Sequence, residues 1–144
     1  MHQNNRFKYS VNICDDIESI EVLRPYWQIY QYAPNGDIDY FLMEYKVYEG
    51  KQKPLAVSLH ENGVPKVIFV GRCGYSREAV RFGFRKIDTF NLKSFIISSG
   101  GFLQAEKFNK KDIIVKLLKD FIINSDIDII KINAMEYNSF RSEE

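Results

Sequence analysis

The segment Ser98-Ser99-Gly100-Gly101-Phe102 has the composition of a turn that binds an anionic ligand. It follows residues 92–98, whose density of apolar side chains predicts a strand buried on both faces. Glycine lets backbone N–H groups approach a ligand closely, and a turn that leads toward a helix suits a negatively charged group. The candidate cofactor-binding residues are therefore Ser99, Gly100, Gly101 and Phe102.

The stretch 77–86 alternates basic and apolar side chains. On a strand, its apolar residues share one face, and these are Val80, Phe82 and Phe84. The opposite face carries the arginines, which are Arg77, Arg81 and Arg85. A helix would have Gly83 in its interior at a cost of about 1 kcal/mol, so we predict a strand.

The arginine face, extended by Arg72 and Lys86, has the chemistry to bind phosphate or carboxylate. Guanidinium groups recognise such anions through charge-assisted hydrogen bonds. The alternative is a solvated outer face of the sheet. The candidate substrate or anion contacts are Arg72, Arg77, Arg81 and Arg85. No aromatic side chains share this face, so we predict no stacking with single-stranded nucleic acid.

The histidines and cysteines are too few and too widely spaced for a metal site. His2 and His60 are far apart in the sequence, and neither is closely spaced with a cysteine. Cys14 and Cys73 lack the CxxC spacing of redox sites, so we interpret them as small buried side chains. A cysteine nucleophile is the alternative.

Length and composition indicate one globular domain. The chain has 144 residues, of which 45% are hydrophobic and 27% charged. Residues 1–50 carry 4 basic and 8 acidic side chains, whereas residues 51–144 carry 16 and 11. This modest polarity argues against salt-driven nucleic-acid binding. No apolar run is long enough to span a membrane, and no signal peptide is visible, so we expect a cytoplasmic protein.

The N-terminal third predicts a short strand over residues 7–13 and then two helices. Asp16 is a cap for the first, whose apolar side is Ile20, Leu23, Trp27 and Tyr30. Pro25 either kinks this helix or marks where its regular part begins, close to Arg24. Asp37 is a cap for the second, which ends at Gly50.

The remaining chain predicts a sheet and one long helix. Strands over 55–59 and 67–70 flank Asn62-Gly63, the strongest hairpin signal in the chain. We expect Asn109 to cap a long helix whose apolar face is Ile113, Ile114, Leu117, Leu118, Phe121 and Ile122. A strand follows over residues 127–132. Strand, helix and strand in this order favour a parallel crossover, so the sheet should be mixed, with its parallel pair near the middle.

This order of elements resembles the GNAT acyltransferase superfamily. More specifically, it is similar to the N-terminal half of bacterial FemAB-like proteins, which contain two GNAT-type halves. The motifs that carry the resemblance are residues 20–27, 34–39, 70–72 and 99–103, within a span of 20–133. The resemblance implies an α/β (α+β) fold with a mixed, mostly antiparallel sheet and a central parallel pair. Two N-terminal helices and one long C-terminal helix would flank that sheet, in a single domain over 1–133 with a polar tail over 134–144.

The resemblance also implies that this half and a second half have different functions. The GNAT cofactor loop reads Arg or Gln, two residues, Gly, one residue, Gly or Ala, and its N–H groups hold the pyrophosphate of acyl-CoA. In this chain Gly100 and Gly101 are adjacent, and the Arg or Gln is missing. In FemAB-like proteins the second half usually supplies the acyl-donor site. We therefore expect no required cofactor here, with acetyl-CoA or another acyl-CoA as the alternative.

Our leading hypothesis is an N-terminal half that shapes an acceptor-substrate groove and packs on a catalytic half outside this chain, supplied in trans or lost by truncation. Such proteins resemble acyl or aminoacyl transferases that act on amines of cell-envelope or polysaccharide precursors. A self-sufficient small N-acetyltransferase using the amides of residues 99–101 is one alternative. A non-enzymatic protein-interaction domain is the other. We expect a second GNAT-like half or a homo-oligomer as partner, and neither nucleic acid nor membrane; the catalytic residues stay unassigned.

Overall fold

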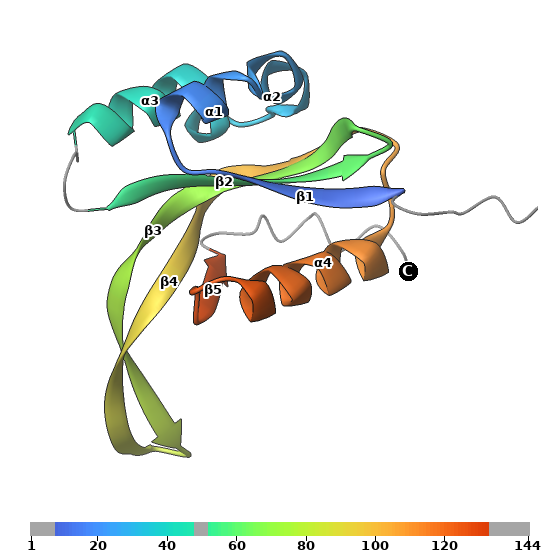
Figure 1. The fold of residues 1–144 in the computed structure, drawn as a ribbon. Coiled ribbons are helices and arrows are strands. Elements are labelled where there is room, and N and C mark those ends of the chain that lie inside the picture. Colours follow the sequence, from blue (N-terminus) through green and yellow to red (C-terminus); the bar gives the residue numbers. More distant parts are fainter. Residues whose placement is uncertain (1–7, 48–51, 133–144) are drawn as a thin grey trace, which may run out of the picture.

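A computed structural model describes residues 8–47 and 52–132 of the chain (Figure 1). The helices are α1 (Ile17–Glu21), α2 (Arg24–Tyr30), the 3₁₀ turn η1 (Pro34–Gly36), α3 (Ile38–Val47) and α4 (Lys111–Asn124). The strands are β1 (Tyr9–Cys14), β2 (Lys53–Glu61), β3 (Val64–Phe82), β4 (Arg85–Gln104) and β5 (Ile129–Ile132). Phe7, Gly50 and the predicted tail over 134–144 lie outside the described residues.

All five strands form one sheet in the order β1-β2-β3-β4-β5. The first three pairings are antiparallel, and β5 joins β4 in parallel from Ser94↔Ile129 to Ile97↔Ile132. The mixed, mostly antiparallel sheet is thus confirmed. Its parallel pair was expected near the middle but lies at one edge of the described sheet, because β5 has no neighbour there beyond β4.

The two faces of the sheet are covered by different helices, which makes three layers (Figure 1). On one face, Ala56, Ile68 and Val70 pack with residues of α1–α3. On the other, Val57, Phe69 and Phe95 pack with α4. Consecutive strand residues point to opposite faces, so β3 supplies Ile68 and Val70 to one core and Val67 and Phe69 to the other.

The N-terminal helices are stabilised by the side chains that their sequence predicts. Asp16 caps α1, its Oδ1 accepting from the Ser19 backbone N–H at 2.7 Å. Asp37 Oδ1 accepts from the N–H groups of Asp39 at 2.9 Å and Tyr40 at 3.1 Å at the start of α3. The predicted first helix is divided in two. Its second part, α2, begins at Arg24 with Pro25 in its first turn, which confirms the alternative in which the regular part begins close to Arg24.

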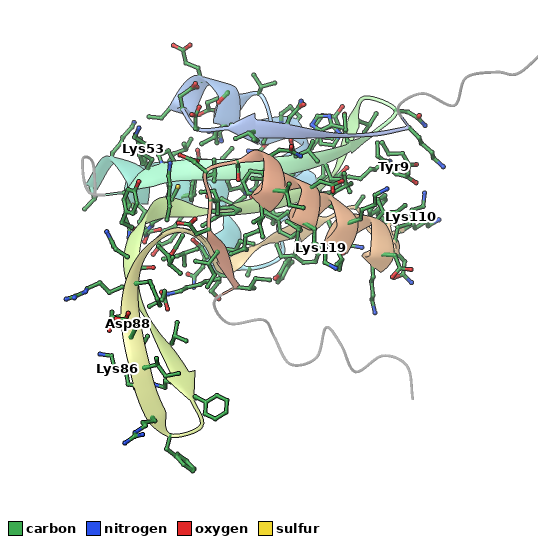
Figure 2. All side chains as sticks on the ribbon, turned by 60° about the horizontal axis from the view of Figure 1, so that its bottom comes forward. Tyr9, Lys53, Lys86, Asp88, Lys110 and Lys119 are labelled. Atoms are coloured by element: carbon green, nitrogen blue, oxygen red, sulfur yellow. The ribbon has the colours of Figure 1, made fainter. Side chains whose placement is uncertain are left out.

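The long helix confirms its predicted apolar face but not its predicted cap. Ile114 and Phe121 are buried against the sheet, with the other predicted apolar positions packed around them. The helix begins at Lys111, and Lys110 is its N-cap without a side-chain hydrogen bond. Asn109 therefore lies one residue too early to cap it. Lys110 instead donates from Nζ to Glu61 Oε2 and to Tyr9 Oη, each at 2.8 Å, at the end of the sheet visible in Figure 2.

Beyond the body of the domain, β3 and β4 continue together as a projecting arm, residues 75–91 (Figure 1). The expected single strand over 77–86 is therefore wrong, because β3 ends at Phe82 and β4 begins at Arg85. Gly83, at φ 61°, opens a two-residue turn, a conformation that glycine adopts without a Cβ penalty. The alternating pattern continued through this turn and concealed it.

Candidate functional site

A groove of about 440 Å³ lies between the α1–α3 layer and the β3–β4 part of the sheet. Its polar lining comes from η1, α3, β3 and β4, and includes Asn35, Tyr40, Glu44, Arg72, Ser98 and Ser99. Two of the predicted site residues, Arg72 and Ser99, are brought together here. A volume of this size is within the range of small-molecule sites.

The groove contains an ion pair between Arg72 and Glu44. Arg72 follows Ile68 and Val70 at every second position of β3, so its side chain leaves the sheet on the face covered by α3. Its Nη2 contacts Glu44 Oε1, and each side chain keeps about a quarter of its surface exposed, 28% and 26%. The site therefore presents a guanidinium and a carboxylate side by side, which suits a ligand with both an anionic and a cationic group.

A bulge in β4 brings Ser98 and Ser99 to the groove. On β3, Val70 alone separates Phe69 and Gly71, whose partners on β4 are Phe102 and Ile97. The four residues 98–101 therefore lie opposite one residue of β3. Extra residues of this kind leave the regular ladder and redirect side chains. The expectation that residues 98–102 form a turn ending a strand is wrong, since β4 continues to Gln104.

Backbone packing explains the two glycines of this bulge. Gly100 has φ +75°, and a Cβ there would lie 3.0 Å from the Gly36 backbone N and 3.2 Å from Ala33 Cβ. A Cβ on Gly101 would lie 2.3 Å from the Val70 carbonyl oxygen. Gly36 itself is held in place by Trp27, whose Nε1 donates to its carbonyl oxygen at 2.6 Å. Glycine is thus required here so that the bulge can contact η1 and β3.

The predicted cofactor-binding residues do not fit a pyrophosphate. Gly100 and Gly101 are both buried, and backbone atoms of other elements occupy the space beside their α-carbons. Phe102 stacks on Phe69 with ring centroids 5.1 Å apart. Of the four, Ser99 alone lines the groove. The segment 105–110 between β4 and α4 contains no glycine. We therefore assign acyl-CoA no site at residues 99–102.

The remaining predicted anion contacts lie on the arm, away from the groove. Arg77 and Arg81 alternate along β3 as expected, with Asn91 and Lys86 as their cross-strand partners. Arg85 lies beyond the turn, opposite Phe82, and so does not extend that arginine face. The four arginines therefore divide into Arg72 in the groove and three on the arm.

A second hollow, of about 620 Å³, opens on the other face of the sheet beside the end of α4. Its lining includes Cys73, Tyr75, Lys53 and Lys93. Lys93 forms an ion pair with Asp126, and its backbone N–H donates to Asp128 at 2.8 Å. These acidic residues thus attach the segment before β5 to β4.

The cysteines behave as small core side chains. Cys14 is buried and Cys73 half-buried, and neither forms a disulfide. Burial raises the pKa of both thiols, so both stay protonated at neutral pH, which disfavours a nucleophilic role. Within residues 8–47 and 52–132, no group of three or more His, Cys, Asp or Glu residues could hold a metal ion.

Sequence reasoning missed Asn35, Tyr40 and Glu44 as groove residues. Tyr40 and Glu44 are four positions apart on the second predicted helix, so the sequence does indicate that they lie on the same helix face. Nothing local indicated that this face would meet Arg72, which is 28 positions further along the chain than Glu44.

No protein-family model matches the chain, and no curated protein matches it by sequence. Solved structures with a related arrangement include a GNAT family acetyltransferase of Staphylococcus aureus, at 14% identity and TM-score 0.47, covering 95% of this chain and 94% of that one. A ribosomal-protein-alanine N-acetyltransferase of Brucella melitensis shows 9% identity and TM-score 0.44, covering 90% and 82%. A mutant Bacillus halodurans protein shows 13% and 0.47, covering 90% and 84%.

Proposed function

We propose that this chain is a GNAT-like, acyltransferase-type domain that binds an amine-bearing acceptor in the groove and acts with a catalytic half outside this sequence. The observation that carries the proposal is the Arg72–Glu44 pair beside the hydroxyl groups of Ser98 and Ser99. Glu44 can bind an ammonium group, and Arg72 can bind a carboxylate or phosphate of the same molecule. The acceptor is thus a small amine that also carries an anionic group.

The packing of the bulge supports an acceptor-binding role over a donor-binding one. An acyl-CoA would need exposed backbone N–H groups for its pyrophosphate, whereas Gly100 and Gly101 are packed against η1 and β3. The self-sufficient N-acetyltransferase is consequently the weaker hypothesis. The protein-interaction alternative would use the exposed arginines of the arm, Arg77, Arg81 and Arg85, rather than the groove.

Calorimetric titration of the folded chain with acetyl-CoA, CoA, glycine, glycinamide and acetate tests this proposal. We expect saturable binding of glycine, weaker binding of glycinamide and acetate, and no binding of the two coenzymes. Saturable acetyl-CoA binding at micromolar concentrations would overturn the acceptor-half proposal in favour of a self-sufficient enzyme.

A charge-neutral variant localises the site. Glu44→Gln should weaken glycine binding by about tenfold or more, because a hydrogen bond to a charged group contributes about 1.5–3 kcal/mol. Glu18→Gln is the matched control, since Glu18 lies exposed on α1 and is absent from the groove lining. Equal affinity in both variants would remove the groove from consideration.

A further inference from the structure

The tip of the arm exposes large apolar side chains to an unusual extent. Phe84 is fully exposed, at 105%, and Phe82 is 81% exposed. Ile87, at 64%, follows closely on β4. Phe82 is the last residue of β3 and Phe84 lies with Gly83 in the turn, so both residues are at the distal end of the hairpin. Isolated exposed apolar residues are ordinary, but a contiguous group marks an interaction site.

Basic residues surround these rings. Arg81, Arg85 and Lys86 lie within two positions of Phe82 or Phe84, whereas the nearest acidic residues, Glu78 and Asp88, lie four positions away from these phenylalanines. Figure 2 shows Lys86 and Asp88 on the arm, where it extends beyond the body. Asp88 accepts from the Thr89 backbone N–H at 2.7 Å. No ion pair involving Arg81, Arg85 or Lys86 is formed among the described residues.

The base of the arm is attached to the sheet by side-chain contacts. Glu78 on β3 forms an ion pair with Lys131 on β5. Ser76 donates from its hydroxyl to Glu78 Oε1 at 2.9 Å and lies 2.5 Å, oxygen to oxygen, from the hydroxyl of Ser94 on β4. The ladder of β3 and β4 continues from there to Phe82↔Arg85. These contacts attach the base of the arm to β4 and β5.

From these observations we infer that the arm is a membrane anchor, whose tip inserts Phe82 and Phe84 into the interfacial region of an anionic phospholipid bilayer while Arg81, Arg85 and Lys86 contact the lipid phosphates. Aromatic rings favour the boundary between headgroups and acyl chains, and basic residues are attracted to anionic leaflets. Only the distal end of the arm needs to reach the surface, and no other helix or strand of the described residues lies beside it (Figure 1).

A second copy of this chain fits the same tip less well. Two arms meeting tip to tip would bring together their arginines and lysines, and like charges in contact oppose association. An anionic bilayer can accept the aromatic rings in its interfacial region and bind the basic side chains through its phosphates. The inference does not depend on the proposed acceptor groove.

This inference revises the sequence expectation of no membrane partner, which rested on the lack of a long apolar run. Across residues 8–47 and 52–132, no helix has the length and hydropathy required to cross a bilayer. Interfacial contact has no such requirement, because it depends on the apolar area buried at the surface and on attraction between basic residues and anionic lipids.

A tryptophan at the tip reports insertion directly. The native chain has one tryptophan, Trp27, which is fully buried in the body. In Phe84→Trp we expect a blue shift of emission and quenching by brominated lipid with phosphatidylglycerol-containing vesicles, and neither with phosphatidylcholine alone. Ile29→Trp, at a 75% exposed position on α2, is the control and should not respond.

Substitution of the tip residues should weaken vesicle binding in graded steps. Phe82→Ala with Phe84→Ala should reduce vesicle partitioning by at least about tenfold, and each of Arg81→Gln, Arg85→Gln and Lys86→Gln by about fivefold. The paired control Val22→Ala with Ile29→Ala should leave partitioning unchanged. Added salt should weaken binding because it screens the phosphate contacts.

Three results would overturn the inference. The first is unchanged Phe84→Trp emission with phosphatidylglycerol vesicles. The second is a blue shift without vesicles that grows with protein concentration, which would indicate docking to a second copy. The third is saturable binding of soluble glycerol phosphate that competes with the vesicles, which would indicate a site for free anions instead.

Discussion

The two halves of the β3–β4 ladder have the same pairing but opposite surroundings. In the proximal half, Val67, Phe69, Phe95 and Ile97 are buried between α4 and the rest of the sheet. In the distal half, Phe82, Phe84 and Ile87 lie in solvent. Both halves are paired antiparallel, so pairing alone does not explain the apolar residues of the arm. The body needs its aromatic residues for folding, whereas the arm carries its own for contact with something else.

The largest difference between the two halves is expected when one methyl group is added to a glycine of each. In Gly71→Ala the new Cβ would lie 1.9 Å from the Ile96 carbonyl oxygen, so the body must distort. We expect a loss of about 5 kcal/mol in the free energy of unfolding, or failure to fold. Gly83→Ala meets open space and strains only φ +61°, a cost of about 1 kcal/mol. Urea titration followed by circular dichroism measures both, and similar losses would contradict the contrast.

Truncation of one phenylalanine in each half gives the next largest difference. Phe95 is fully buried and contacts Phe121 of α4 with ring centroids 6.2 Å apart. Phe95→Ala should therefore cost about 4 kcal/mol through lost burial and a residual cavity. Phe82→Ala should change stability by less than about 0.5 kcal/mol. Thermal melts of the two variants measure these changes in stability. A large loss of stability in Phe82→Ala would show that the arm contributes to folding.

A smaller effect separates two aspartates. Asp37 caps α3 and also accepts from Gln31 Nε2 at 3.0 Å, so Asp37→Ala should cost about 1 kcal/mol. Asp88→Ala, on the arm, should cost less than about 0.5 kcal/mol. The Tyr40 backbone hydrogen bond lowers the pKa of Asp37, so its contribution is present above the unfolded pKa and is lost as pH falls through the folded pKa. Denaturant midpoints measured at neutral and acidic pH test both statements.

The smallest expected effect concerns the ion pair at the far end of the body. Lys110 lowers the pKa of Glu61 below its ordinary 4.5, and Glu61 raises the pKa of Lys110 above its ordinary 10.5. Stabilisation is therefore complete between these ordinary values. It is lost as pH falls through the folded pKa of Glu61 or rises through that of Lys110. Glu61→Gln should flatten the acid side of the stability profile slightly, because it removes the carboxyl group whose pKa Lys110 lowers. Identical profiles for Glu61→Gln and the unmodified chain would refute this assignment.

Local signals predicted those parts of the fold that depend on neighbouring residues. Asn62 and Gly63 have φ of 52° and 79°, as a tight hairpin turn requires. Trp27 and Ile20 are fully buried on the predicted helix face. The turn at the tip of the arm was not predicted, and the reason is also local. Gly83 can be either an unfavourable residue within one strand or the first residue of a turn. Alternation on both sides favoured the former.

The candidate site was only half predictable. Arg72 and Ser99 were singled out for their chemistry, but Glu44 and Tyr40 join them only because α3 packs over β3. Gly100 and Gly101 were singled out as ligand contacts for their lack of a side chain. That same property serves close packing against Gly36 and Val70, and the sequence does not distinguish the two uses.

By itself, the sequence determined the types of element, because helix caps, apolar periodicity and glycine turns act over a few residues. It also determined that the sheet is mixed, since a long helix joins two neighbouring strands. Only the tertiary structure decided that the parallel pair lies at an edge of the described sheet, that two glycines pack rather than bind, and that Arg72 meets Glu44. Burial of one face of each helix and strand selects those contacts, and that choice involves the whole core at once.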